Sequence, residues 1–137
     1  MSEDNFAELI ATATKARLQS VAPFSKFLVG AAVKTKAGKV YTGCNVESAS
    51  YGLTVCAERV AIWKALSEGE REFSELAIVA DTEQLTPPCG TCRQIIHEFC
   101  ENAIIVLSNL KGETETCNIE KLLPRAFDAR FLSGAAK

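Results

Sequence analysis

Three cysteines and one glutamate have the spacing of a metal-dependent hydrolytic site. Cys56 and Glu58 are separated by one residue, and Cys89 and Cys92 follow about thirty residues later with two residues between them. Three thiolates suit a soft ion such as Zn²⁺, and a three-ligand site keeps one position for water. A nearby carboxylate can move protons for that water. The pattern predicts a catalytic centre with one Zn²⁺ per chain, ligated by the cysteines and served by Glu58.

Charge balance at this centre brings in further residues. Zn²⁺ with three thiolates carries a net charge of about −1. We expect Cys56 and the Cys89/Cys92 pair to start two helices, whose N-termini stabilise thiolates. Arg59 lies three residues after Cys56 on the same helical face, so we expect its guanidinium to offset the extra thiolate. Gln94, two residues after Cys92, is placed in the same surroundings.

Other interpretations of these residues remain open. The site could be a structural four-cysteine zinc site with Cys44 as the fourth ligand, or a group of buried cysteines without metal. Glu58 could be a solvated acid favoured by the helix dipole. Cys100 and Cys117 lack partners at ligand spacing, and we expect both to be packing residues. His97, the only histidine, is expected on the helix surface or in the core.

Length and composition limit the kind of protein. A chain of 137 residues with 47% hydrophobic content predicts one domain, residues 1–137. The formal net charge is −2 and basic residues are scattered, which argues against a nucleic-acid partner. The sequence shows neither a signal peptide nor a membrane-spanning apolar run. We therefore expect a cytoplasmic protein without a membrane partner, whose six cysteines are not paired in disulfides.

Hydrophobic periodicity predicts the elements that position these residues. Helices are expected at residues 4–19, 57–68 with Gly69 as the cap, 90–100, and briefly from 119 to the break at Pro124. Strands are expected at residues 27–34, 40–46, 76–80, 103–107 and, more weakly, 113–118. The first two strands form a hairpin, and later strands alternate with helices. Such crossovers build parallel strands covered by helices, which predicts an α/β fold.

The sequence resembles the small, homotetrameric class of zinc-dependent cytidine deaminases. The resemblance extends beyond the metal motif and keeps the order of the family's motifs. It rests on residues 22–27, 29–32, 43–47, 49–52, 56–59, 67–69, 88–94, 98–99 and 122–127. It implies a three-layer α/β/α architecture with a mixed sheet of about five strands.

The resemblance also implies the reaction. Members of the family deaminate cytidine and 2′-deoxycytidine to uridine and 2′-deoxyuridine with release of ammonia, in pyrimidine salvage. By this resemblance, zinc-bound hydroxide attacks C4 of the base while Glu58 shuttles the protons. Asn45 and Glu47 are implied to hold the ribose, and Ala57 to contact the substrate. On a strand, residues two apart face the same way, which independently supports the Asn45–Glu47 pair.

Aromatic residues complete the implied site. Phe24 and Phe127 correspond to aromatics that pack on the pyrimidine, with Phe127 arriving from a neighbouring subunit. Without the resemblance, both would be expected in the core. Tyr51 is likewise implied to act across a subunit interface. The resemblance thus predicts a homotetramer that binds a small nucleoside in sites shared between subunits.

Three rival functions fit parts of the pattern. A deaminase of another cytosine-containing small molecule, such as blasticidin S, would share the metal motif but not the sugar pair. A polynucleotide-editing deaminase would need a basic surface. A non-enzymatic, zinc-stabilised module would need no Glu58. Departures from the family pattern at Phe24, Leu28, Ser48 and Pro87 affect the expected substrate range more than the expected reaction.

Overall fold

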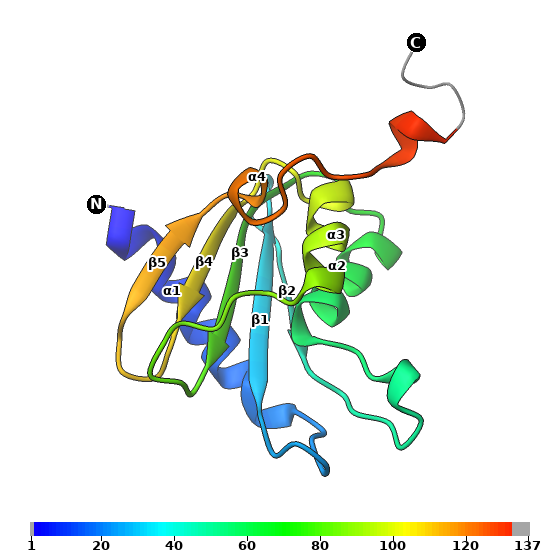
Figure 1. Cartoon of the computed structure of the whole chain (residues 1–137). Coiled ribbons are helices and arrows are strands. Elements are labelled where there is room, and N and C mark those ends of the chain that lie inside the picture. Colours follow the sequence, from blue (N-terminus) through cyan, green and yellow to red (C-terminus); the bar gives the residue numbers. More distant parts are fainter. Residues whose placement is uncertain (1, 133–137) are drawn as a thin grey trace.

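One mixed five-stranded sheet forms the centre of the structure, a computed structural model that describes residues 2–132 (Figure 1). The strand order is β2-β1-β3-β4-β5. The strands are β1 (Val29–Thr35), β2 (Val40–Cys44), β3 (Phe73–Ala80), β4 (Ile104–Ser108) and β5 (Thr114–Cys117). The expected mixed sheet of about five strands is therefore confirmed.

The direction of the strands follows from the predicted hairpin and crossover. Strand β1 pairs antiparallel with β2, through a turn in which Gly38 adopts a φ of +99° that favours glycine. Strand β1 also pairs antiparallel with β3, and β3 pairs parallel with β4. Because β1 lies between β2 and β3, those two strands run in the same direction without touching. Strand β5 closes the sheet as an antiparallel edge.

Helices cover both faces of the sheet, which confirms the three-layer architecture (Figure 1). Helix α1 (Ser2–Ala16) lies on one face, and helices α2 (Ala57–Ser67) and α3 (Gly90–Phe99) lie on the other. Alternate residues of β3 point to opposite layers: Ile78 packs in the core beneath α2 and α3, and Val79 in the core beneath α1. The expectation that this strand is buried on both faces is confirmed.

Helix α2 packs unusually close to β2. A Cβ built on Gly43 would lie 2.3 Å from the carbonyl oxygen of Ala57 and 2.5 Å from the backbone nitrogen of Ala61. Only a residue without a side chain permits this approach. Since Ala57 is the first residue of α2, Gly43 sets the height at which the N-terminus of α2 lies above the sheet.

Element boundaries differ from the predictions by a few residues. The first helix ends at Ala16 and continues as the 3₁₀ helix Arg17–Gln19. Strand β3 begins at Phe73, earlier than expected, because Phe73 pairs with Thr35 beyond a register shift in β1. The short helix α4 (Ile119–Leu122) precedes Pro124 as predicted. None of the helices described combines the length and apolar character that crossing a bilayer requires.

Candidate metal centre and active site

Two helix N-termini carry the predicted metal ligands. Cys56 is the residue that precedes α2, and Cys89 the residue that precedes α3. Cys92 follows within the first turn of α3 and is buried. The expectation that Cys56 starts one helix and the Cys89/Cys92 pair starts another is confirmed. At these helix N-termini, backbone N–H groups and the helix dipole stabilise thiolates.

The three sulfurs form one cluster. The Sγ atoms of Cys56, Cys89 and Cys92 lie within 4.8 Å of one another, and those of Cys56 and Cys89 are 3.7 Å apart. This is too far for a disulfide and suits thiolates that share one ion. Among the described residues, no other His, Cys, Asp or Glu belongs to the cluster. Cys44 is therefore not part of the cluster, and a tetrahedral ion held by the three sulfurs would keep its fourth coordination position open.

The pKa values of the cysteines indicate that the cluster needs a cation to hold three thiolates. The pKa of Cys56 falls to about 5, chiefly because the thiol of Cys92 donates a hydrogen bond to it and also because Arg59 lies nearby. The pKa of Cys92 is raised, since it shares its proton with Cys56 and is buried. The cluster thus holds one thiolate readily, whereas three thiolates need a cation between them. A dication that prefers sulfur, such as Zn²⁺, fits this donor set.

Arg59 approaches the cluster from the first turn of α2. Its Nη2 donates to the Sγ of Cys56 at 3.7 Å. The predicted contact between this guanidinium and a cysteine sulfur is present. The positive charge of Arg59 therefore lies next to Cys56, at the outer side of the sulfur cluster. The amide of Gln94 donates to Oε2 of Glu98 at 2.7 Å and to the carbonyl of Phe127 at 2.8 Å, and its predicted place in the surroundings of the cluster stays a prediction.

Glu58 is buried in the same turn of α2, with 4% of its surface exposed. Burial raises the pKa of Glu58 to about 7, and the neighbouring Cys56 sulfur adds to this, while a backbone hydrogen bond and Arg59 oppose it. A carboxyl group near half-ionisation at neutral pH can both accept and donate protons. The alternative interpretation of Glu58 as a solvated acid is therefore wrong.

Asn45 follows the end of β2 and is buried. Its Oδ1 accepts from the backbone N–H of Val29 at 2.9 Å, and its Nδ2 donates to the carbonyl of Phe27 at 2.7 Å. The side chain therefore holds the segment that enters β1, and one Nδ2 hydrogen and one lone pair of Oδ1 remain available for another partner.

Glu47 binds the same entering segment a few residues earlier. Its Oε1 accepts from the backbone N–H groups of Phe24 at 3.0 Å and Ser25 at 3.1 Å, and the hydroxyl of Ser25 donates to Oε2. The Ser25 hydroxyl is the main reason that the pKa of Glu47 is lowered. Asn45 and Glu47 thus both contact the segment that leads into β1. The expectation that they lie on a strand is wrong, because β2 ends at Cys44, and their role in holding the sugar stays a prediction.

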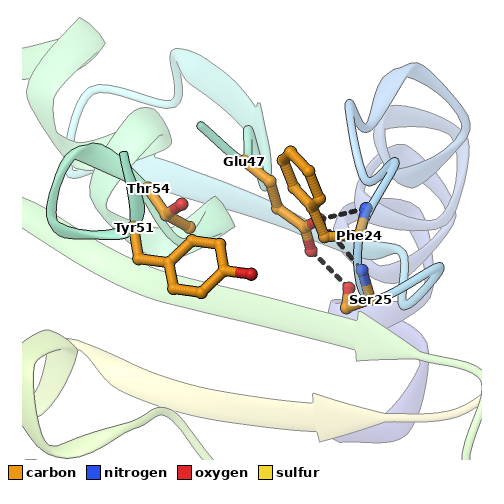
Figure 2. A pocket seen from close by; sticks show the side chains of 5 residues that line it. All are labelled: Phe24, Ser25, Glu47, Tyr51 and Thr54. Atoms are coloured by element: carbon orange, nitrogen blue, oxygen red, sulfur yellow. Dashed lines mark hydrogen bonds between the residues drawn. The ribbon is translucent and has the colours of Figure 1, made fainter. Parts of the chain in front are cut away.

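A hollow of about 270 Å³ lies beside Glu47 (Figure 2). The rings of Phe24 and Tyr51 meet edge to face, with centroids 6.0 Å apart. Both aromatic side chains are exposed, so the expectation that Phe24 belongs to the core is wrong. The lining also includes two residues that the sequence did not single out, Ser25 and Thr54.

A backbone bridge lies between the residues of this hollow and the first cysteine of the cluster. Val46 and Val55 exchange two backbone hydrogen bonds of 3.0 Å as an isolated antiparallel bridge. Because the pairing is antiparallel, Glu47 lies opposite Thr54 on one side of the bridge, and Asn45 lies opposite Cys56 on the other. The bridge therefore places Asn45, and not Glu47, across from the first predicted metal ligand.

Phe127 lies in the C-terminal segment, which leaves the body of the molecule beyond α4 (Figure 1). Its ring is exposed and stacks on Phe131 with centroids 5.8 Å apart, so it is not a core residue. His97 joins this segment to α3, because its Nε2 lies 2.8 Å from Oδ2 of Asp128. Cys100 is buried and Cys117 packs against the core, as expected for packing residues.

Comparison with known proteins fits this geometry. Residues 3–108 match the family described as the cytidine and deoxycytidylate deaminase zinc-binding region. The chain belongs to this family. It is 51% identical over 131 residues to a cytidine deaminase of Sporosarcina psychrophila, covering 95% of this chain and 96% of that one. It is 48% identical over 126 residues to a cytidine deaminase of Halalkalibacterium halodurans, covering 91% and 96%.

A solved structure of the family shares the fold. The crystal structure of cytidine deaminase from Burkholderia pseudomallei superposes with a TM-score of 0.85 at 46% identity, covering 88% of this chain and 97% of that one. The region matched by the family includes Glu58 and all three cysteines of the cluster, whereas Phe127 lies beyond it. Zinc is therefore the metal that both the family and the sulfur donors indicate.

Proposed function

We propose that this protein is a zinc-dependent hydrolase that converts cytidine and 2′-deoxycytidine to uridine and 2′-deoxyuridine with release of ammonia. The observation that carries the proposal is a buried carboxyl group, Glu58, beside a cluster of three sulfurs that no fourth ligand from residues 2–132 joins. Family membership supports the same reaction.

Cys56, Cys89 and Cys92 would hold the metal. Bound Zn²⁺ supplies Lewis acidity, which makes water acidic enough to lose a proton near neutral pH. Arg59 donates to Cys56 from outside the cluster, and the two helix N-termini face it. These groups offset the negative charge that three thiolates bring to a divalent ion.

Glu58 would move every proton in the reaction. It takes a proton from the attacking water and gives it to N3 of the cytosine ring as oxygen bonds to C4. It then takes the remaining proton from the new hydroxyl on C4 and passes it to the 4-amino group, the C4–N bond breaks as the C4 carbonyl forms, and ammonia leaves. One water is consumed and one ammonia is released. Burial favours this cycle because the pKa of Glu58 lies at about 7.

The hollow beside Glu47 would receive the nucleoside. Glu47 is an anionic acceptor for a sugar hydroxyl, and Asn45 keeps a donor hydrogen for the same purpose. Phe24 and Tyr51 offer aromatic surface, which suits a planar base. We assign Ala57, the first residue of α2, to the substrate contacts as well, because it lies between Cys56 and Glu58.

We further propose that the protein is a single-domain homotetramer in which Phe127 and Tyr51 act across subunit interfaces. Support comes from their exposure: 56% of Phe127 and 76% of Tyr51 are accessible in the single chain. The cytoplasm and pyrimidine salvage are the proposed setting. Six unpaired cysteines suit a reducing compartment.

The direct test is to follow the ultraviolet absorbance of cytidine with the purified protein and to assay ammonia in parallel. Both signals should appear together, vanish when the metal is removed by a chelator, and return with Zn²⁺. Blasticidin S and single-stranded DNA serve as competing substrates. Turnover of blasticidin S or single-stranded DNA in preference to cytidine, or no ammonia from a zinc-loaded protein, would overturn the proposal.

A further inference from the structure

Trp63 lies one helical turn beyond Arg59 on α2. The Cζ atom of Arg59 is 5.7 Å from the centroid of the Trp63 ring, within the range of a cation–π contact. The spacing of four residues places both side chains on one face of the helix. The chain contains one tryptophan, and 44% of it is exposed.

Arg59 lacks the partner that such a residue usually has. Among the described residues, no carboxylate lies within ion-pair distance of its guanidinium. Its Nε is buried without a hydrogen-bond partner, and its Nη2 donates to the Sγ of Cys56. A guanidinium with a buried Nε is normally paired with an acid. Here the face of an indole ring occupies the place next to it.

The replacement of a carboxylate by an indole ring beside Arg59 affects the charge that reaches the metal ligands. A carboxylate beside Arg59 would neutralise the guanidinium and compete with Cys56 for its donors. The indole face attracts a cation through its quadrupole while adding no net charge. The indole therefore leaves the positive charge of Arg59 available to the sulfur cluster, which needs it once three thiolates surround a divalent ion.

We propose that Trp63 is a positioning residue of the zinc centre, which holds the guanidinium of Arg59 against Cys56 without neutralising it. The inference rests on the proposed role of Cys56 as a zinc ligand. It concerns the affinity of the thiolates for zinc. Trp63 does not line the hollow beside Glu47, so substrate binding should not depend on it.

The test measures zinc affinity by competition with a chromophoric chelator at one fixed pH. Trp63→Phe keeps an aromatic face and should stay within about twofold of the unaltered protein. Trp63→Leu keeps only apolar bulk and should weaken zinc binding about three- to tenfold, the range of a half-exposed cation–π contact. Trp63→Glu should weaken it further, because the new carboxylate pairs with Arg59.

Ser67→Glu is the matched control, since exposed Ser67 lies one turn further along the same face and beyond the reach of Arg59. It adds the same charge and should leave zinc affinity within about twofold. Trp63→Gln, suited to a helix surface, replaces Trp63→Leu if that variant fails to fold. The KM for cytidine should stay constant throughout the series.

Equal zinc affinities in the unaltered protein and in Trp63→Leu would overturn the inference. Equal losses in Trp63→Glu and Ser67→Glu would also overturn it, because the effect would then come from the added charge on the helix and not from its place beside Arg59. A protein that binds no zinc at all would instead overturn the proposed function. The two failures are therefore distinguishable.

Discussion

The Oε1 atom of Glu47 accepts a hydrogen bond from the backbone N–H of Phe24 at 3.0 Å. The carboxylate proposed to hold the sugar therefore also fixes the aromatic residue proposed to contact the base. Substrate binding and the local fold depend on the same group, because Ser25 donates to this carboxylate as well.

Replacement of Glu47 by alanine should raise the KM for cytidine more than it lowers kcat. Charge-assisted hydrogen bonds are worth about 1.5–3 kcal/mol, which predicts a loss of about 10- to 100-fold in kcat/KM. Glu47→Gln keeps an acceptor for Phe24 and should lose less. Steady-state kinetics on cytidine and zinc content by metal analysis check this. A value of kcat/KM within twofold of the unaltered protein in Glu47→Ala would contradict it.

Asn45→Ala should destabilise the fold independently of catalysis. The change leaves the buried N–H of Val29 and the carbonyl of Phe27 without the partners that Asn45 provides. An orphaned buried group costs about 1–3 kcal/mol of unfolding free energy, measured by urea denaturation of the metal-free protein. Asn118→Ala is the comparison, because it removes an exposed helix cap and should cost about 1 kcal/mol. Equal costs for the two variants would refute the buried role of Asn45.

Gly43→Ala should displace α2 from β2. The new Cβ meets the backbone of Ala57 and Ala61, which cannot move aside as a flexible side chain would. We expect a loss of about 1–3 kcal/mol in unfolding free energy and weaker zinc binding, because α2 carries Cys56 on its N-terminus. Gly52→Ala is the control, since nothing lies within 4 Å of its new Cβ. Unchanged stability and zinc affinity in Gly43→Ala would argue against this close approach.

The C-terminal segment should loosen in acid. Hydrogen bonds from Arg130, and then the contact with His97, hold the pKa of Asp128 well below its usual range. A lowered pKa in the folded state stabilises the segment above the unfolded pKa of about 3.9. That stabilisation is lost as the pH falls through the folded pKa.

Hydrogen-exchange protection of the Phe131 amide, which donates to the carbonyl of Asp128, reports this loss. Protection should be constant from neutral pH to about pH 4 and fall below it. Asp128→Asn should show weaker protection at neutral pH and little further change in acid. A constant difference between the two proteins across this range would contradict the role of Asp128.

The metal cluster could be predicted from the sequence because its geometry is local. Cys89 and Cys92 share one helical turn, and Cys56 and Glu58 share the start of another, so spacing alone indicates which side chains come together. The strands were also predictable, because β3 and β4 are short apolar runs. The position of β1 between β2 and β3 could not be predicted in the same way, because strands that pair across a long stretch of chain show no pattern in the local sequence.

Other parts of the site could not be predicted from the spacing of residues in the sequence. The contacts of Asn45 and Glu47 with backbone groups at residues 24–29 depend on a long-range approach of the chain. Ser25 and Thr54 became visible as lining residues only when the loops met. Trp63 did leave a signal, its spacing of four residues from Arg59, but that spacing is common in surface helices.

Glu58→Gln gives the most direct measurement of the central claim. The variant keeps the shape of the side chain and all three sulfurs, so it should retain about one zinc per chain. Turnover of cytidine to uridine, followed by absorbance and ammonia release, should fall at least about a hundredfold, because no carboxyl group remains to move protons. A zinc-loaded Glu58→Gln protein that turns cytidine over at the unaltered rate would contradict the account.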